Sequence, residues 1–265
     1  MKNILLYTVL LVASCCTTTA LAQENTEVST TSKFRNFFQE NMDHQLRAQF
    51  SVGGSTPLGM PASIREVNSY NPTLQLGLEF TTTKWFSESQ KWGIRTGLRF
   101  EGRGMKTDAN VKNYYTQIDG EEGKQTKGYF TGNVKTTMKN SYVTFPVLAT
   151  WKATNSWNVY GGFYFSGLID KDFTGYVYDG VMREGTPVGT PIVFEESAKG
   201  DYDFSNELNR FQWGLEFGGE YKMNEHFRLF ADLNWGLNPL FKKDFDAITF
   251  NMYSIYVNLG FGYQF

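Results

Sequence analysis

The sequence predicts an all-β fold, a closed antiparallel up-and-down transmembrane β-barrel of eight strands. The first observation is a strict period of two over residues 253–265, which is typical of a strand with two unlike faces. The second is the length of that strand, because a strand of about 9–11 residues, tilted by about 45°, crosses a bilayer. The third is that the connections between successive strands alternate between long and short, as they do in membrane barrels.

The closing strand, 253–265, has large apolar side chains at every odd position. Every even position except Tyr256 is small or polar, so we expect the odd positions to face lipid. The strand resembles the closing strand of bacterial outer-membrane barrels, whose terminal Phe is recognised by the insertion machinery. The candidate membrane-insertion signal is therefore Phe265 together with Tyr263 and Phe261.

Seven further segments complete the predicted barrel, at 45–52, 73–81, 92–101, 141–151, 157–165, 211–221 and 227–235. The segment 141–151 is apolar on both sides, and we take its odd positions, from Val143 to Trp151, as the outward ones. Pro146 in this segment cannot donate a ladder hydrogen bond, which predicts a bulge. Ten strands remain possible if part of 104–140 or 173–205 pairs into the wall.

Aromatic residues flank the short turns at 84–90, 152–156 and 222–226. Tyr and Trp favour the interface between membrane and water. The flanking residues therefore predict a periplasmic aromatic girdle, made of Trp85, Trp92, Trp151, Trp157, Tyr221 and Phe227. The alternative is a soluble barrel whose core holds these aromatic residues.

The face opposite the apolar one carries charge within the strands. In an eight-stranded membrane barrel this face lines an interior only wide enough for side chains, where an unpaired charge is costly. We therefore expect a lumen charge network of Arg47, Glu79, Arg95, Arg99, Glu216, Arg228 and Asp232, with Glu101 and Glu220 on the same face. In a soluble binding barrel, by contrast, this face would meet solvent and the apolar face would line a ligand cavity.

The N-terminal residues predict export. Residues 1–22 have the positive start, apolar stretch and small-residue cleavage site of a signal peptide. A lipoprotein processing site at Cys15 is the alternative to cleavage after Ala22. We expect a periplasmic leader at 23–43 and the barrel at 44–265, in the outer membrane of a Gram-negative bacterium. Both cysteines lie in the predicted signal peptide, so we expect no disulfide in the mature chain.

The composition favours neither catalysis nor nucleic-acid binding. A net charge of −2 with scattered basic residues gives no concentrated basic face. His44 and His226, the two histidines, lie at predicted periplasmic strand ends, which disfavours a catalytic triad or a zinc site at the outer rim. We expect no cofactor, no metal and no enzymatic activity.

The segment 141–151 (SYVTFPVLATW) resembles the strand motif YLEIPLLLKY of an outer-membrane β-barrel family common in Bacteroidetes, which includes PorT-like proteins. Pro146 matches the proline of the motif, whereas Thr144 replaces its acidic residue. The segments 159–164 and 259–265 are similar to the same family. The resemblance implies a barrel of eight to ten strands in the outer membrane, and PorT-like members are associated with type IX secretion.

The function expected from the sequence is a structural or surface-interaction role, exerted by long extracellular loops on a monomeric barrel. The expected partners are lipid, lipopolysaccharide, the barrel insertion machinery and an extracellular or secretion-system protein. The alternatives are a component of a secretion or assembly system, and a narrow channel for small solutes.

Overall fold

The computed structural model describes residues 40–86, 91–119 and 125–265, apart from the side chains of residues 196 and 197. The chain divides into two units, Met1–Glu40 and Asn41–Phe265, and every described strand belongs to the second unit. The predicted signal peptide and the predicted leader up to residue 39 lie outside the described residues. Within the described ranges, no helix has the length and apolar character needed to cross a membrane.

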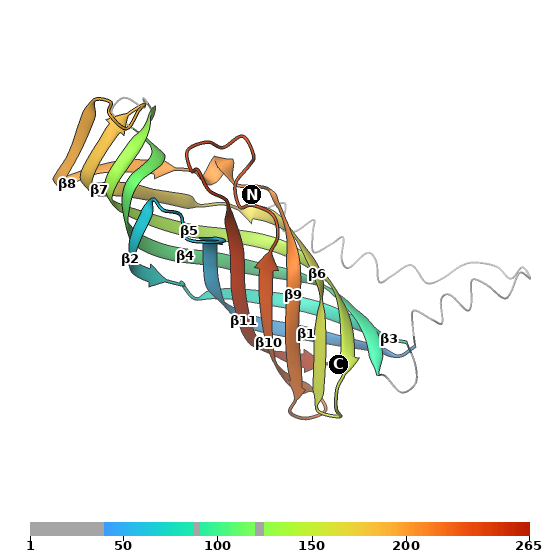
Figure 1. Ribbon diagram of the computed structural model, residues 1–265. Coiled ribbons are helices and arrows are strands. Elements are labelled where there is room, and N and C mark those ends of the chain that lie inside the picture. The colour runs from blue at the N-terminus through green and yellow to red at the C-terminus, as the bar shows by residue number, and fades with distance from the viewer. Residues whose placement is uncertain (1–39, 87–90, 120–124) are drawn as a thin grey trace, which may run out of the picture. The chain divides into compact units, whose positions relative to one another are not determined.

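Eight antiparallel strands form a closed ring, because the neighbours β4-β3-β1-β11-β10-β9-β6-β5 are joined by a further pairing of β4 with β5 (Figure 1). The ring strands are β1 (Met42–Pro57), β3 (Gln75–Trp85), β4 (Trp92–Asp119), β5 (Gln125–Lys152), β6 (Trp157–Asp170), β9 (Phe211–Lys222), β10 (Phe227–Gly236) and β11 (Met252–Gln264). Every pairing around the ring, including that of β4 with β5, joins two strands that run in opposite directions. The up-and-down antiparallel order is therefore as predicted.

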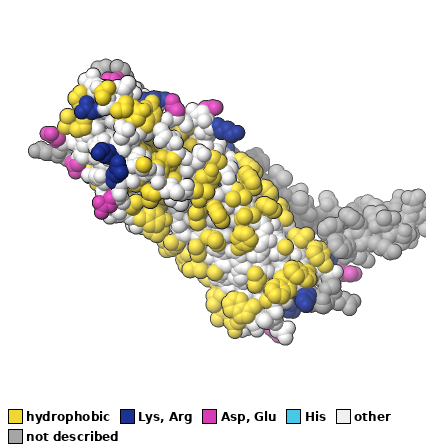
Figure 2. Space-filling model, viewed as in Figure 1, with side chains coloured by type: hydrophobic (Ala, Val, Ile, Leu, Met, Phe, Trp, Pro, Cys, Tyr) yellow, Lys and Arg dark blue, Asp and Glu magenta, His cyan; other side chains and the backbone are white. Residues whose placement is uncertain are grey.

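The ring strands alternate between an apolar outward face and a polar inward face. In β10, side chains from Phe227 to Gly236 are exposed and buried in strict alternation. The ambiguous segment of β5 follows the predicted phase, with Phe145, Val147 and Trp151 exposed on the outside. Figure 2 shows hydrophobic side chains spread over the ring strands, with charged side chains gathered towards the two ends.

Three more strands lie beyond the ring, where the sequence analysis expected loops. β4 and β5 are 28 residues long each, and their pairing continues to Asp119 and Gln125. β2 (Ile64–Asn71) pairs with β4, β7 (Phe173–Glu184) with β5, and β8 (Pro191–Asp203) with β7. We call this five-stranded sheet, with residues 104–119 of β4 and 125–139 of β5, the extension.

The described residues therefore form an eleven-stranded sheet, of which eight strands make up the ring and three lie beyond it. The wall does not take up 104–140 or 173–205 as ring strands, because their pairings are with each other and with β2. The expected bulge at Pro146 is wrong. Pro146 pairs with Tyr164 in register, and the nearest shift lies at Ser141. Towards β4 the ladder omits residues 145 and 146 and resumes in the same register, so the missing N–H leaves a gap rather than a shift.

The extension has a conventional apolar core. Side chains of Val111, Phe130, Val177 and Phe194 are buried on one face of the sheet. The short helix η2 (Ser205–Glu207) and the connection 237–251 pack against this face through Leu208, Leu240, Phe241 and Ile248. Backbone hydrogen bonds hold this connection in place, from Asn209 N–H to the Leu240 carbonyl and from Leu240 N–H to the Met252 carbonyl.

Candidate functional site

The interior of the ring is filled by ion pairs. Arg99 Nη2 lies 3.0 Å from Glu79 Oε1 and 2.7 Å from Glu216 Oε1. Arg47 Nη1 lies 3.0 Å from the other oxygen of Glu79, so this one carboxylate joins two guanidinium groups. All four side chains have no exposed surface.

Further pairs extend the network towards both ends of the ring. Arg95 pairs with Glu220 at 2.9 Å, and Arg103 pairs with Glu101 at 2.6 Å. The Tyr160 hydroxyl donates to Asp232 and accepts a hydrogen bond from Arg47 at 2.7 Å. Asp232 itself lies 3.6 Å from Arg47. Charges removed from water are tolerated only when they are paired in this way.

Aromatic rings hold the guanidinium groups from the sides. Arg47 lies 3.5 Å from the centre of the Phe230 ring. Arg103 lies among three rings, 4.8 Å from Tyr142, 5.2 Å from Tyr164 and 5.9 Å from Tyr256. Contacts of this kind between a cation and a ring are worth roughly 0.5–2 kcal/mol each.

One glycine is required by this packing. A Cβ at Gly218 would lie 2.7 Å from the Tyr160 ring and 2.3 Å from Asp232 Oδ1. Gly218 therefore leaves the space in which Tyr160 reaches Asp232.

The seven predicted network residues do not all behave alike. Six of them form the ion pairs described above, whereas Arg228 does not. Its guanidinium donates to the Gln264 side chain at 2.6 Å and to the Asn224 carbonyl at 2.6 Å. Arg228 lies at the turn end of β10, where backbone carbonyls are free to accept hydrogen bonds. The prediction that Arg228 belongs to the ion-pair network is therefore wrong.

Arg103 is the network residue that the predicted list lacks. The predicted strand ended at Glu101, whereas β4 continues, and Arg103 follows the same odd-numbered inward phase as Arg95 and Arg99. Extending the alternation by two residues would have found it.

Five of the six predicted girdle residues lie on the outside near the short turns. Trp92 stacks on Trp151 at 5.8 Å, Trp157 packs on Tyr221 at 5.0 Å, and Phe227 packs on Tyr263 at 5.5 Å. The candidate insertion residues Phe261, Tyr263 and Phe265 are also exposed on the outside of the ring.

Trp85 is the exception, and its girdle assignment was wrong. It is only 3% exposed and lies inside the ring, where its indole N–H donates to Asp43 Oδ2 at 2.8 Å. The outward residues of β3 are even-numbered, from Leu76 to Phe80, so an odd-numbered Trp85 points inward. Gly93, which pairs with Trp85, leaves room for the indole, because a Cβ at Gly93 would lie 3.1 Å from an indole carbon.

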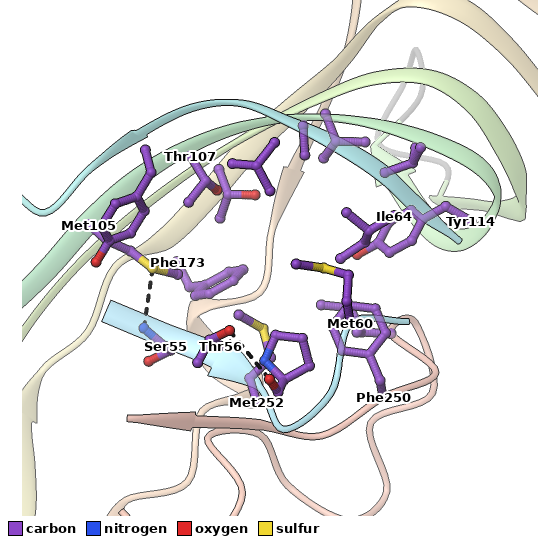
Figure 3. Close-up of a pocket in the computed structure, with 18 of the residues that line it drawn as sticks. Ser55, Thr56, Met60, Ile64, Met105, Thr107, Tyr114, Phe173, Phe250 and Met252 are labelled. Atoms are coloured by element: carbon purple, nitrogen blue, oxygen red, sulfur yellow. Dashed lines mark hydrogen bonds between the residues drawn. The ribbon is translucent and has the colours of Figure 1, made fainter. Parts of the chain in front are cut away.

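A cavity of about 270 Å³ lies beyond the network, between the end of β1, β2, the extension and the connection before β11. In Figure 3, Met105 and Phe173 lie on one side of it, and Met60 and Phe250 lie on the other. Met105 lies just beyond Arg103 on the same face of β4. The cavity thus adjoins the extension core.

The described residues offer no constellation for metal catalysis, since no group of three or more His, Cys, Asp or Glu side chains gathers among them. Both histidines have structural neighbours. His44 hydrogen bonds with the Thr82 hydroxyl at 3.0 Å, and His226 stacks on Tyr263 at 5.3 Å.

A family model described as "Outer membrane protein beta-barrel domain" matches residues 22–242. This match spans most of the chain, and the closed ring of strands with an apolar exterior agrees with it. The chain therefore belongs to this family of outer-membrane proteins, and its ring strands are transmembrane strands. No curated protein matches the chain.

Several solved structures resemble the chain weakly. Ail, the attachment invasion locus protein of Yersinia pestis, is 10% identical with a TM-score of 0.31, over 84% of this chain and 97% of Ail. OprG from Pseudomonas aeruginosa is 16% identical with a TM-score of 0.29, over 84% and 95%. Neisserial surface protein A is 12% identical with a TM-score of 0.30, over 85% and 98%. The family match, and not these likenesses, carries the assignment.

Proposed function

We propose that the chain is a closed, eight-stranded transmembrane barrel that does not conduct solutes and that displays the extension outside the cell for contact with an external partner. The single observation that carries this proposal is the reversed polarity of the ring, with apolar side chains outside and fully buried ion pairs inside. A filled interior opposes the small-solute channel. A folded extension of five strands supports a surface-interaction role more strongly than mobile loops would.

The orientation follows from the position of the short turns. In membrane barrels of this kind the short turns face the periplasm and the long connections face outward. The strand ends that flank the short connections lie at one end of the ring, at Trp85 and Trp92, Lys152 and Trp157, and Lys222 and Phe227, and the extension lies at the other end. The girdle residues at the short turns would then contact the inner lipid headgroups, and the extension would lie among lipopolysaccharide sugars.

Other parts of the proposal rest on the sequence. They are a signal peptide cleaved after Ala22, recognition of Phe265 by the insertion machinery, a monomeric state, and membership of the Bacteroidetes branch with PorT-like proteins. The residues that resemble the PorT-like motif serve the wall of the ring, with Phe145 and Val147 outward and Tyr142 against Arg103. These residues therefore support a barrel, and they give no support to a role in secretion.

Cysteine labelling of intact cells tests the orientation. Val188, 87% exposed in the turn between β7 and β8, and Met223, 58% exposed in the turn between β9 and β10, provide a matched pair. A membrane-impermeant maleimide should label V188C in intact cells and M223C only after permeabilisation. Labelling of M223C alone in intact cells would overturn the orientation.

Conductance tests the closed interior. The mature chain in planar lipid bilayers should show no stable current steps, because the charged side chains inside the ring are buried and paired with one another. Steps in the nanosiemens range would contradict the closed barrel and favour the channel. Loss of protein secretion in a strain that lacks the chain would instead favour the secretion role.

A further inference from the structure

The cavity at the outer end of the ring has a wall without charge. None of its nineteen lining residues is Asp, Glu, Lys, Arg or His. This is unusual for its surroundings, because the outward face of the extension carries Lys106, Asp108, Lys135 and Lys139 close by in the chain. The same strands therefore place charge on one face and exclude it from the other.

The cavity grades from an exposed mouth to a buried floor. Met60 and Tyr70 at the mouth are 65% and 49% exposed. Met105 and Phe173 on the floor are 2% exposed each. Figure 3 shows the Met60 side chain directed into the space between these walls. A molecule could thus enter between β2 and the connection that precedes it.

Most polar groups at the wall already have partners in the protein. Ser55 N–H donates to the Met105 sulfur at 3.2 Å, and its hydroxyl pairs with Ser254 at 3.3 Å. The Tyr202 hydroxyl pairs with Thr136 at 2.7 Å and with the Lys135 carbonyl at 3.1 Å. Burial raises the pKa of the Tyr114 and Tyr202 phenols, which keeps both neutral. A charged guest would therefore lose its hydration without meeting a side chain of opposite charge in the wall.

The wall is also chemically suited to an apolar guest. Thioethers of Met60, Met105 and Met252 and the rings of Phe173 and Phe250 line the space. Methionine is unbranched and polarisable, so it adapts to guests of different shape and makes favourable contacts with aromatic rings. An apolar cavity of roughly 150 Å³ is enough to stay dry and bind benzene.

From this geometry we infer that the cavity is a binding site for a small, uncharged, apolar molecule of about ten non-hydrogen atoms, such as an alkyl-substituted ring. The site is independent of whether the ring conducts. It gives the extension a second role beside contact with a macromolecular partner.

Methionine methyl NMR tests this inference on the whole mature chain in detergent micelles. The probe is butylbenzene, with 4-phenylbutyrate and 4-phenylbutylamine as charged matches. Butylbenzene should shift the methyl signals of Met60, Met105 and Met252 in a saturable way. Met42 and Met223 lie at the opposite end of the ring and serve as internal controls for partition into the micelle. Equal, non-saturating shifts at all five methyl groups would overturn the site.

A pair of matched substitutions tests the location. Ala109 lines the cavity, whereas Ala198 is exposed on β8 of the same extension. A109F should fill the cavity and weaken butylbenzene binding at least tenfold, while A198F should bind as the parent does. Unchanged affinity in a folded A109F chain would refute the site.

The charged probes test the chemistry of the site. Both should shift the three cavity methyl groups at least tenfold less than butylbenzene at equal concentration. Equal shifts from either charged probe would refute the apolar character. Absence of butylbenzene binding would leave the labelling and conductance results unaffected, so the two proposals fail separately.

Discussion

Along β4, the inward side chains change character within three residues. Arg103 is buried beside Glu101, and Met105, two positions further on, belongs to the apolar core of the extension. The facing strand β5 changes at the same level, from Tyr142 against Arg103 to Met138 against Met105. The ring and the extension are thus two regions of one pair of strands with opposite interiors.

At the same level of β4 and β5, the outward side chains change from apolar to charged, which is the opposite of the change inside. Phe100 and Val143 are paired on the apolar outside of the ring, whereas Lys106 and Lys139 follow on the outside of the extension. Polarity is therefore set by the medium outside. Lipid accepts only apolar side chains, which leaves the polar ones to satisfy each other within, and water imposes the reverse. The switch marks the end of the apolar band that is nearest the extension.

The largest effect should come from breaking the ion pairs of the ring. E79Q removes the carboxylate charge that joins Arg47 to Arg99 and leaves both buried guanidinium groups with less compensating negative charge. We expect a loss of about 3–5 kcal/mol in the free energy of unfolding, measured by urea titration in lipid vesicles. E195Q, at an exposed position of β8, is the control and should change it by less than about 0.5 kcal/mol.

Removing an apolar side chain should be costly only where the core is apolar. Phe130 is fully buried in the extension, against Phe194 at 6.1 Å. F130A should cost about 3 kcal/mol, with faster hydrogen exchange confined to the extension. F145A, on the outside of the same strand in the ring, should leave exchange in the extension unchanged. Uniform acceleration in F130A would show that the two regions unfold together.

The same comparison explains which parts of the fold could be predicted. A period of two with an apolar outside is conspicuous over a whole bilayer thickness, so the ring strands, their order and the phase of residues 143–151 followed from the sequence. In the extension β2 is short, the parts of β4 and β5 are continuations of ring strands, and the apolar side chains point inward. Residues 173–203 are rich in Gly, Asp and Glu, a composition that resembles that of a loop when no lipid-facing side is present.

The errors at the site have similar causes. Trp85 is placed in the girdle because it lies next to a short turn, although its odd number in β3 puts it on the inward face. Arg228 was assigned by parity alone, although its position at a turn offers it backbone carbonyls. The cavity could not be predicted, because its lining residues come from β1, β2, β4, β5, β7, β8 and the connection before β11, and no local pattern brings these together.

Arginine on the outside should distinguish the two media directly. Leu259 in β11 and Val193 in β8 are each 52% exposed. L259R should cost about 2–4 kcal/mol because it would place a charge in lipid, whereas V193R should cost almost nothing in water. Urea titration of both variants in vesicles measures the difference. Equal costs would show either that Leu259 lies outside the apolar band or that Val193 does not face water.

The smallest effect concerns the connection that covers the extension core. Lys127 Nζ lies 2.6 Å from Asp246 Oδ1, and both side chains are largely exposed. The hydrogen bond between them lowers the pKa of Asp246 and raises that of Lys127. Stabilisation is therefore complete between the ordinary pKa values of the two groups, roughly pH 4 to 10. It is lost as the pH falls through the lowered pKa of Asp246 or rises through the raised pKa of Lys127.

D246N should accordingly cost a few tenths of a kcal/mol near neutral pH, because water and salt screen an exposed pair. Hydrogen exchange in residues 240–250 should speed up slightly at pH 7, and parent and variant should converge once the pH falls below the lowered pKa of Asp246. D244N is the control, because Asp244 lies two residues earlier and takes no part in the pair with Lys127. It should match the parent at every pH. A loss of several kcal/mol in D246N would mean that this connection, and not the sheet, holds the extension together.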